Sequence, residues 1–419
     1  MWKQSHCKKG SRPLDKDLSS SSSHVSDIDS EENIEEENLV WVDERAKETW
    51  VKYDRYLMEK YRDEHSNIPN LMKFSGHELP VARIKKKCMD YVVLMTRTHM
   101  VDRTLSGNNN NLITTEKANY PPYGADFPKG ATGRFTNGRT SADIIGQLLG
   151  FPGFIPPYAT ATDAEIISGV NYGSGGAGIL PESGINLGDR ISMDEQLLNH
   201  AAIIARLSVL QGNKTFTNEY IKKCIYLVNI GNNDYVNNYL MPDTYPDGRI
   251  YNPDQFASVL IRQYSKQLRT LNKLGARKIA VFGLTLIGCT PAEIAMFGTN
   301  GEPCVDSINN VTQLFTNRIK PLIDDLNNAF ADARFTFINF TNIFPPQEGE
   351  LVPNVPCCRV QSNALCVPYS VPCPNRTLEI WYDGFHPSEI ANTLTASRSY
   401  NALSPMDASP YDISHLAQL

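Results

Sequence analysis

An aspartate and a histidine lie three residues apart near the C-terminus, at Asp383 and His386, in a segment that is typical of a loop. A carboxylate at this spacing can accept a hydrogen bond from the imidazole, which orients the ring and stabilises its protonated form. A histidine beside a carboxylate is more often structural than catalytic, so the pair needs further groups around it. With such groups it would form the base end of a hydrolytic active site.

Two further segments contain donors that could stabilise negative charge on a reacting oxygen. In the segment 231–234, the amide of Asn233 can donate to a developing oxyanion, and the preceding glycine lets the backbone approach a substrate closely. In the glycine-rich segment 171–178, the backbone N–H of Gly175 or Gly176 is a candidate for a second donor. Taken alone, the first segment is also compatible with a tight turn and the second with a flexible loop.

Alternating strands and helices are expected to position these groups. Apolar, β-branched runs that are typical of strands buried on both faces lie at 166–170, 225–230, 279–282 and 335–338. The clearest helix begins with Asn252 as N-cap and Pro253 at the first position, and it ends at Gly275. This alternation predicts a parallel sheet with helices on both faces, in which ligands bind at the carboxyl ends of the strands. We therefore expect all three segments to converge in one cleft.

Composition excludes several classes of protein. The 419 residues suffice for one large domain with an extension, and the net charge of −6 provides no basic field for nucleic acid. No apolar run reaches the ~18 residues of a transmembrane helix. The first forty residues are polar and lack the apolar centre of a signal peptide.

Cysteines and glycosylation motifs favour an oxidising compartment. Six of the nine cysteines lie between Cys289 and Cys373. Four N-glycosylation motifs begin at Asn213, Asn310, Asn339 and Asn375. An odd number of cysteines leaves at least one thiol unpaired, and we predict that it is Cys7 or Cys88.

The N-terminal quarter differs in texture from the remainder. Residues 1–40 are rich in serine and acidic residues, which predicts a disordered tail. Residues 41–66 have the pattern of a charged helix with one partial apolar face. The basic segment 77–86 faintly resembles the start of the histone fold in the CCAAT-binding nuclear factor Y, but the following helices of that fold do not appear. A basic turn and short helix is the better interpretation.

From Gly107 to about residue 400, the chain resembles the plant GDSL esterase/lipase family, which has the SGNH hydrolase fold. The matching motifs, in chain order, are Gly107-Asn-Asn-Asn-Asn111, Tyr120-Pro-Pro-Tyr-Gly124, Gly133-Arg-Phe-Thr-Asn-Gly-Arg139, the 171–178 loop, Gly231-Asn-Asn-Asp234, Gly288-Cys-Thr-Pro291, Cys357-Cys358 and the segment 381–387. The resemblance implies an α/β, flavodoxin-like three-layer sandwich with a central parallel sheet, here with an irregular or helical N-terminal extension.

The resemblance also implies roles for the candidate residues. His386 would be the general base of carboxylic ester hydrolysis and Asp383 its orienting carboxylate, with no metal or cofactor. The oxyanion donors would be Asn233, a glycine of the Gly175–Gly176 pair, and the backbone N–H of the nucleophile.

Further expectations follow from the same resemblance. The partner would be a small-molecule or lipid ester, the protein a monomer without a transmembrane segment, and its location extracellular. The resemblance and the modest spacing favour a disulfide between Cys289 and Cys304. The remaining cysteines of the cluster, Cys357, Cys358, Cys366 and Cys373, allow several pairings.

One block of the family pattern is missing. The family has a strand, then Gly-Asp-Ser-Leu, a few residues before the Gly-Asn-Asn-Asn run. Counted back from Gly107, the nucleophile position is occupied by Asp102, and the nearest strand-like run, 91–95, ends several residues too early. Ser106 is a hydroxyl nearby, but a shift of four residues displaces it by several ångströms, whereas ~1 Å already matters for catalysis.

Together these observations predict an esterase domain over 107–400 without its first block, preceded by an atypical segment at 41–106 and followed by a tail at 401–419. Three functions compete: an ester hydrolase impaired by the absent nucleophile, a non-catalytic protein that binds esters or lipids, and a nuclear protein. The acidic charge opposes the third. The abrupt change near residue 100 indicates that the N-terminal part was joined to a truncated hydrolase, as a real fusion or as a wrongly assembled gene model.

Overall fold

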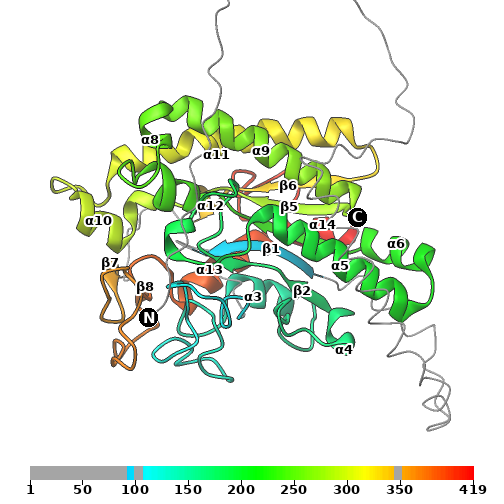
Figure 1. Ribbon diagram of the computed structural model, residues 1–419, viewed down its shortest axis with the longest axis horizontal. Coiled ribbons are helices and arrows are strands. Elements are labelled where there is room, and N and C mark those ends of the chain that lie inside the picture. The colour runs from blue at the N-terminus through cyan, green and yellow to red at the C-terminus, as the bar shows by residue number, and fades with distance from the viewer. Residues whose placement is uncertain (1–91, 99–106, 344–351) are drawn as a thin grey trace, which may run out of the picture. The chain divides into compact units, whose positions relative to one another are not determined.

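Parallel strands form the centre of the fold in the computed structural model, which describes residues 92–98, 107–343 and 352–419 (Figure 1). Several predictions concern residues outside these ranges. They are the disordered tail at 1–40, the helix at 41–66, the segment 77–86, the positions of Asp102 and Ser106, and the thiols of Cys7 and Cys88.

The main sheet has the strand order β2-β1-β4-β5-β6-β9, and β3 pairs with the far end of β1. Its members are β1 (Val92–Thr98), β2 (Gly169–Asn171), β3 (Ser174–Gly175), β4 (Ile225–Asn229), β5 (Lys278–Phe282), β6 (Arg334–Ile338) and β9 (Ala408–Ser409). All pairs are parallel except β6 with β9. Two further strands, β7 (Val352–Pro356) and β8 (Glu379–Trp381), form a separate parallel pair.

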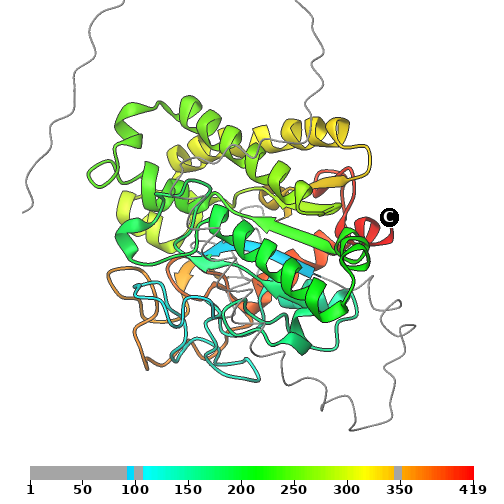
Figure 2. The same ribbon diagram turned by 45° about the vertical axis from the view of Figure 1, so that its right-hand side comes forward.

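Helices cover both faces of this sheet (Figures 1 and 2). On one face α5 packs on α9 and α9 packs on α11, whereas α3 and α14 both pack on α13 on the other. The bounds of these helices are α3 (Ser141–Leu148), α5 (Met193–Gln211), α9 (Pro253–Lys273), α11 (Asp306–Ala329), α13 (Glu389–Tyr400) and α14 (Ile413–Gln418). The α/β fold with a mainly parallel sheet between two helical layers is therefore confirmed.

Shorter helices connect these elements. They are α4 (Asp163–Ile166), α6 (Lys214–Lys222), α7 (Asn232–Asp234), α8 (Asp247–Ile250), α10 (Pro291–Phe297) and α12 (Phe340–Ile343), with 3-10 turns η3 (Ile185–Leu187) and η5 (Ile287–Cys289) and the π-helical turn η4 (Tyr235–Tyr239). Three of them, α7, η4 and α10, lie close to the candidate site described below.

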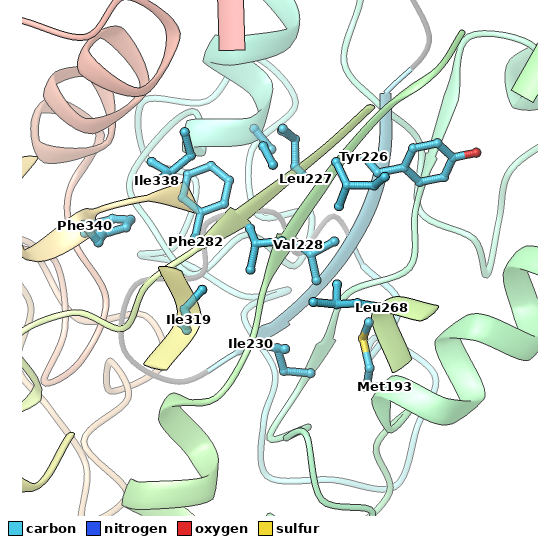
Figure 3. Close-up of a cluster of buried hydrophobic side chains, with 14 of the residues drawn as sticks. Met193, Tyr226, Leu227, Val228, Ile230, Leu268, Phe282, Ile319, Ile338 and Phe340 are labelled. Carbon is cyan, nitrogen blue, oxygen red and sulfur yellow. The ribbon is translucent and has the colours of Figure 1, made fainter. Parts of the chain in front are cut away.

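The predicted strands at 225–230, 279–282 and 335–338 correspond to β4, β5 and β6. Every residue of β4 is buried, as expected for a strand covered on both faces. Figure 3 shows Tyr226, Leu227 and Val228 of this strand within a cluster that includes Leu268 of α9 and Ile319 of α11. Full burial of such a side chain stabilises the fold by roughly 1.5–3 kcal/mol.

The predicted helix after Asn252 is confirmed as α9. The Asn252 side chain accepts a hydrogen bond from the Gln255 N–H at 2.9 Å, and the Gln255 side-chain oxygen accepts one from the Asn252 N–H at 3.0 Å. This capping box satisfies two backbone donors that the helix itself leaves unbonded. The apolar face is wholly buried, with no exposure at Phe256, Leu260, Tyr264, Leu268 and Leu271.

The prediction of a strand at 166–170 is wrong for its first residues. Ile166 is the last residue of α4, and the strand β2 begins only at Gly169. Thr162 and Glu165 form a capping box, in which the Glu165 carboxylate accepts from the Thr162 N–H at 2.9 Å. Capping therefore favours a helical turn here, although the apolar, β-branched run suggested a strand.

The strand before the missing block is also longer than the sequence suggested. We expected it to end at Met95, but β1 continues to Thr98. Thr96 pairs with Asn229 of β4, and Thr98 pairs with Gly175 of β3. Backbone pairing on both sides extends the strand through residues that form no apolar run, so its carboxyl end lies between β4 and the glycine-rich turn.

The C-terminal segment 401–419 is part of the domain rather than a trailing tail. It supplies β9 at the edge of the sheet, and its helix α14 buries Ile413 and Leu416 completely. These residues are three positions apart and therefore lie on one face of the helix.

Three disulfides link cysteines of the C-terminal cluster. Cys289 is bonded to Cys304, as predicted, and the pairings left open are resolved as Cys357–Cys373 and Cys358–Cys366. Cys224, which the prediction of the odd thiol overlooked, is buried, and its Sγ lies 3.4 Å from the backbone oxygen of Tyr220.

Candidate active site

The Asp383–His386 pair is held in a tight turn between β8 and α13. Asp383 Oδ1 accepts the backbone N–H groups of Phe385 at 2.8 Å and of His386 at 2.6 Å. Nδ1 of His386 lies 2.8 Å from Asp383 Oδ2, and both residues are almost fully buried. Because Nδ1 faces a carboxylate, the proton of the neutral ring belongs on Nδ1, which leaves Nε2 as the basic nitrogen.

Tyr123 supports this pair and was not assigned a role from the sequence. Its hydroxyl donates to Asp383 Oδ2 at 2.5 Å and accepts the backbone N–H of Cys366 at 3.1 Å. Burial, followed by the neighbouring Asp383 charge, raises the pKa of Tyr123 well above its ordinary value, so that the phenol remains a donor. Tyr123 belongs to the 120–124 motif, and this match to the family was the only feature of the sequence that pointed to it.

The aromatic ring of Phe135 packs against the imidazole ring of His386. The centroids of the Phe135 and His386 rings are 4.6 Å apart, and Phe135 also contacts Tyr123. The Phe135 ring thus restricts rotation of the His386 imidazole, and the hydrogen bond between Asp383 and Nδ1 fixes the direction in which the imidazole points. Both constraints favour a single orientation of His386.

The glycine-rich turn is held by asparagines of the 107–111 motif. Asn109 Nδ2 donates to the carbonyl of Gly175 at 3.2 Å, and its Oδ1 accepts the Gly175 N–H at 3.0 Å and the Ser174 hydroxyl at 2.7 Å. Asn108 donates to the carbonyls of Asn171 and Gly173 at 2.9 and 2.8 Å. Asn109 therefore engages the N–H of Gly175, and Gly176 is the one of the two predicted candidates whose N–H does not donate to this side chain.

Asn233 lies beside the same turn. Its Nδ2 donates to the carbonyl of Ala177 at 2.8 Å, and its Oδ1 accepts from Asn237 Nδ2 at 2.7 Å. The structure therefore brings together two of the predicted elements, Asn233 and the glycine-rich turn, although 56 positions separate Asn233 from Ala177.

The carboxylate of Asp234 fixes the chain just beyond the turn. It accepts the backbone N–H groups of Ile179 and Leu180 at 2.8 and 2.9 Å. A Cβ on Gly178 would come within 2.6 Å of Asp234 Oδ1, so the close approach of α7 to this loop requires glycine.

A pocket of about 660 Å³ borders these elements. Three of its lining residues are direct neighbours of the predicted groups. Phe385 precedes His386, Asn237 donates to Asn233, and Leu187 lies 3.3 Å from where a Cβ on Gly176 would be. Most of the other lining residues are apolar and come from η4, α10 and the loop at 360–364.

Comparison with known proteins agrees with this geometry. The family model described as GDSL-like lipase/acylhydrolase matches residues 106–399. The chain belongs to this family.

Several curated plant proteins are similar over most of their length. GDSL esterase/lipase At1g29670 of Arabidopsis thaliana is 46% identical over 323 residues, which are 75% of this chain and 88% of the relative. At1g29660 from the same plant is 44% identical with the same coverage. At1g33811 is 39% identical over 364 residues, covering 84% of this chain and 97% of the relative. Membership of this family supports ester hydrolysis as the class of activity.

No helix within the described ranges is long and apolar enough to cross a membrane.

Proposed function

We propose that the chain has the catalytic body of a GDSL-type ester hydrolase, with His386 as general base and Asp383 as its orienting group. The observation that carries this proposal is the buried pair itself, in which Asp383 is bonded to the imidazole, to two backbone N–H groups and to Tyr123. In the reaction, His386 Nε2 would remove the proton of a hydroxyl nucleophile as that oxygen attacks the ester carbonyl carbon.

The attack leaves a negative charge on the carbonyl oxygen of the ester, and this oxyanion requires hydrogen-bond donors to stabilise it. We assign the amide of Asn233 and the backbone N–H of Gly176 to this role. Asn237 orients the Asn233 amide, and Asn109 fixes the turn that carries Gly176. Removal of one such donor typically lowers kcat by about 10²–10³. The alcohol would then leave with the proton from His386, and water would hydrolyse the acyl intermediate with His386 again acting as base.

The nucleophile is the missing component. Asp102 occupies its position by count from Gly107, and a carboxylate there would place negative charge where the reaction develops it. Loss of the nucleophile of such a triad can lower turnover by ~10⁶, with a residual ~10³ over water from the oxyanion donors and binding. We therefore propose that the chain hydrolyses esters very poorly.

Hydrolysis of a p-nitrophenyl ester tests this proposal. The full chain should show only slow turnover, and Ser106→Ala should not reduce it further. His386→Ala should remove part of what remains, because the base can still activate water. Fast turnover that is abolished by Ser106→Ala would instead make Ser106 the nucleophile.

The runner-up function is binding of lipids or esters without hydrolysis. The pocket of about 660 Å³ favours it, because a largely apolar cavity can hold a chain whether or not a nucleophile is present. Tight binding of an ester together with no His386-dependent turnover would support this alternative.

We also propose that the protein is extracellular, glycosylated and monomeric, as expected from its resemblance to the family and from its sequons. The asparagines Asn213, Asn310 and Asn375 are exposed, whereas Asn339 is half-buried. Expression in a secreting plant cell should add glycans at the exposed sites, which a mass shift on deglycosylation would measure. An unglycosylated secreted chain would contradict this proposal.

A further inference from the structure

A row of four basic side chains, the α9 basic row, runs along the outer face of α9. Its members lie at successive spacings of four, three and four positions and are Arg262, Lys266, Arg269 and Lys273. Because an α-helix repeats about every 3.6 residues, these spacings place all four on one narrow face. With a rise of about 1.5 Å per residue, the row is about 17 Å long.

The α9 basic row points away from the protein interior. Arg262, Lys266 and Lys273 are exposed. Arg269 is half-buried, with its guanidinium carbon 5.4 Å from the centroid of the Phe330 ring. The helix packs on α5 and on α11 within the helical layer that covers one face of the sheet (Figure 1). The row therefore lies on the outer surface of that layer.

The acidic residues beside α9 do not neutralise this row. Among the described residues, none of its four cations forms a salt bridge. Asp254, in the first turn of α9, pairs with Arg318 of α11 at 2.5 Å. Asp194 of α5 accepts from the side chains of Gln263 and Gln267 at 3.2 and 3.0 Å. The row thus concentrates positive charge on a chain whose net charge is −6, and such a local field attracts a polyanion.

The composition of this face favours a linear anionic polymer as the partner. A single row of cations matches charges that repeat along one extended chain. The two aromatic residues of α9, Phe256 and Tyr264, are fully buried, which removes the stacking contacts that single-stranded nucleic acids use. No large apolar side chain between Pro253 and Lys273 is exposed, so the helix offers nothing that inserts into a lipid surface.

We infer that the α9 basic row binds an acidic polysaccharide whose carboxylates repeat along the chain. Lysine and arginine form charge-assisted hydrogen bonds with such carboxylates. The choice of a polysaccharide rests on the extracellular location proposed above, whereas the charge of the partner follows from the row itself. No residue of α9 lines the described pocket, so a polymer bound here leaves the pocket open. The row would retain the protein on an extracellular matrix.

Binding of the full chain to polygalacturonate measures this inference directly. Because exposed ion pairs contribute modestly, Lys266→Gln combined with Lys273→Gln should weaken binding about tenfold. The affinity of the unchanged chain should fall as the NaCl concentration rises, since salt screens contacts between exposed charges. Dextran, an uncharged polysaccharide, should not bind.

Lys129→Gln combined with Arg359→Gln is the matched control, because it removes the same charge at exposed positions outside α9. It should bind polygalacturonate as tightly as the unchanged chain does. No binding of polygalacturonate, or equal affinity of the unchanged chain and both double variants, would overturn the inference.

Vesicles that contain phosphatidylserine test a lipid surface as the partner, because the neighbouring α5 exposes Leu198 and Val209. Tighter binding to these vesicles than to polygalacturonate would also overturn the inference. None of these measurements requires turnover or secretion. The proposed hydrolysis and location are tested separately, by turnover and by the mass shift on deglycosylation, so they can fail while this binding is observed.

Discussion

Removing the hydroxyl oxygen of Tyr123 should lower the free energy of unfolding by more than the loss of a single atom usually does. In Tyr123→Phe the ring remains, with its contacts to Tyr120, Phe135 and Tyr382. The substitution deletes the 2.5 Å hydrogen bond to Asp383 and leaves the backbone N–H of Cys366 without its acceptor. Both groups are buried, so water does not replace the lost partner.

The magnitude follows from these two losses. A hydrogen bond to a charged group contributes about 1.5–3 kcal/mol, and an unsatisfied buried N–H costs about 1–3 kcal/mol. We therefore expect Tyr123→Phe to lower the free energy of unfolding by about 4 kcal/mol, with a range of roughly 2.5–6 kcal/mol. Urea unfolding under oxidising conditions, which keep the disulfides intact, measures this change.

Tyr120→Phe provides the matched control. Its hydroxyl donates to the backbone carbonyl of Cys366 at 3.0 Å, and the residue is only half-buried. This neutral, partly solvated bond should contribute about 0.5–1.5 kcal/mol. If Tyr123→Phe were no more destabilising than Tyr120→Phe, the hydroxyl of Tyr123 would not be holding Asp383 in place.

Three further predictions concern other buried polar groups. Asn109→Ala should lower the free energy of unfolding by about 3 kcal/mol or more, because it removes several hydrogen bonds to the glycine-rich turn. Asn110→Ala loses one hydrogen bond to Thr132 and should lower it by about 1 kcal/mol. Equal losses for the two variants in thermal unfolding would contradict the claim that Asn109 holds this turn. Burial lowers the pKa of His200 to about 3, so only the unfolded chain gains this proton between pH 6.5 and 3, and stability falls by about 1.4 kcal/mol per pH unit in that window. His200→Gln should flatten this acid limb in urea unfolding, and an unchanged slope would refute it. Burial raises the pKa of Glu293 to about 7, so its contribution to stability is complete below about pH 4.5 and is lost as pH rises to about 7. Glu293→Gln should therefore gain stability over the wild type at pH 8 relative to pH 4.5, and a pH-independent difference would be inconsistent with a buried acid.

Local patterns in the sequence were sufficient for the elements that bury apolar residues. The strands β4, β5 and β6 and the helix α9 follow from uninterrupted apolar runs and from the capping residues around Asn252. The Asp383–His386 pair could also be predicted, because three residues separate them and the geometry is local.

Contacts between distant residues could not be predicted in this way. Tyr123 reaches Asp383 across 260 positions, and Asn109 reaches Gly175 across 66, so neither bond leaves a local pattern. The end of β1 was missed because pairing with β3 and β4 extends it without an apolar run. The pocket likewise combines Glu293 with residues of η4 and the 360–364 loop, which are remote from it in sequence.

Restoring the missing block measures most directly whether the nucleophile alone is lacking. The full chain with Met100→Gly, Val101→Asp, Asp102→Ser and Arg103→Leu carries the family's Gly-Asp-Ser-Leu at the position counted from Gly107. Its kcat for a p-nitrophenyl ester should exceed that of the unchanged chain by about 10³-fold or more. Adding His386→Ala should remove the gain. Equal turnover of the restored and unchanged chains, with both correctly folded, would contradict the claim that the base, its carboxylate and the oxyanion donors are intact.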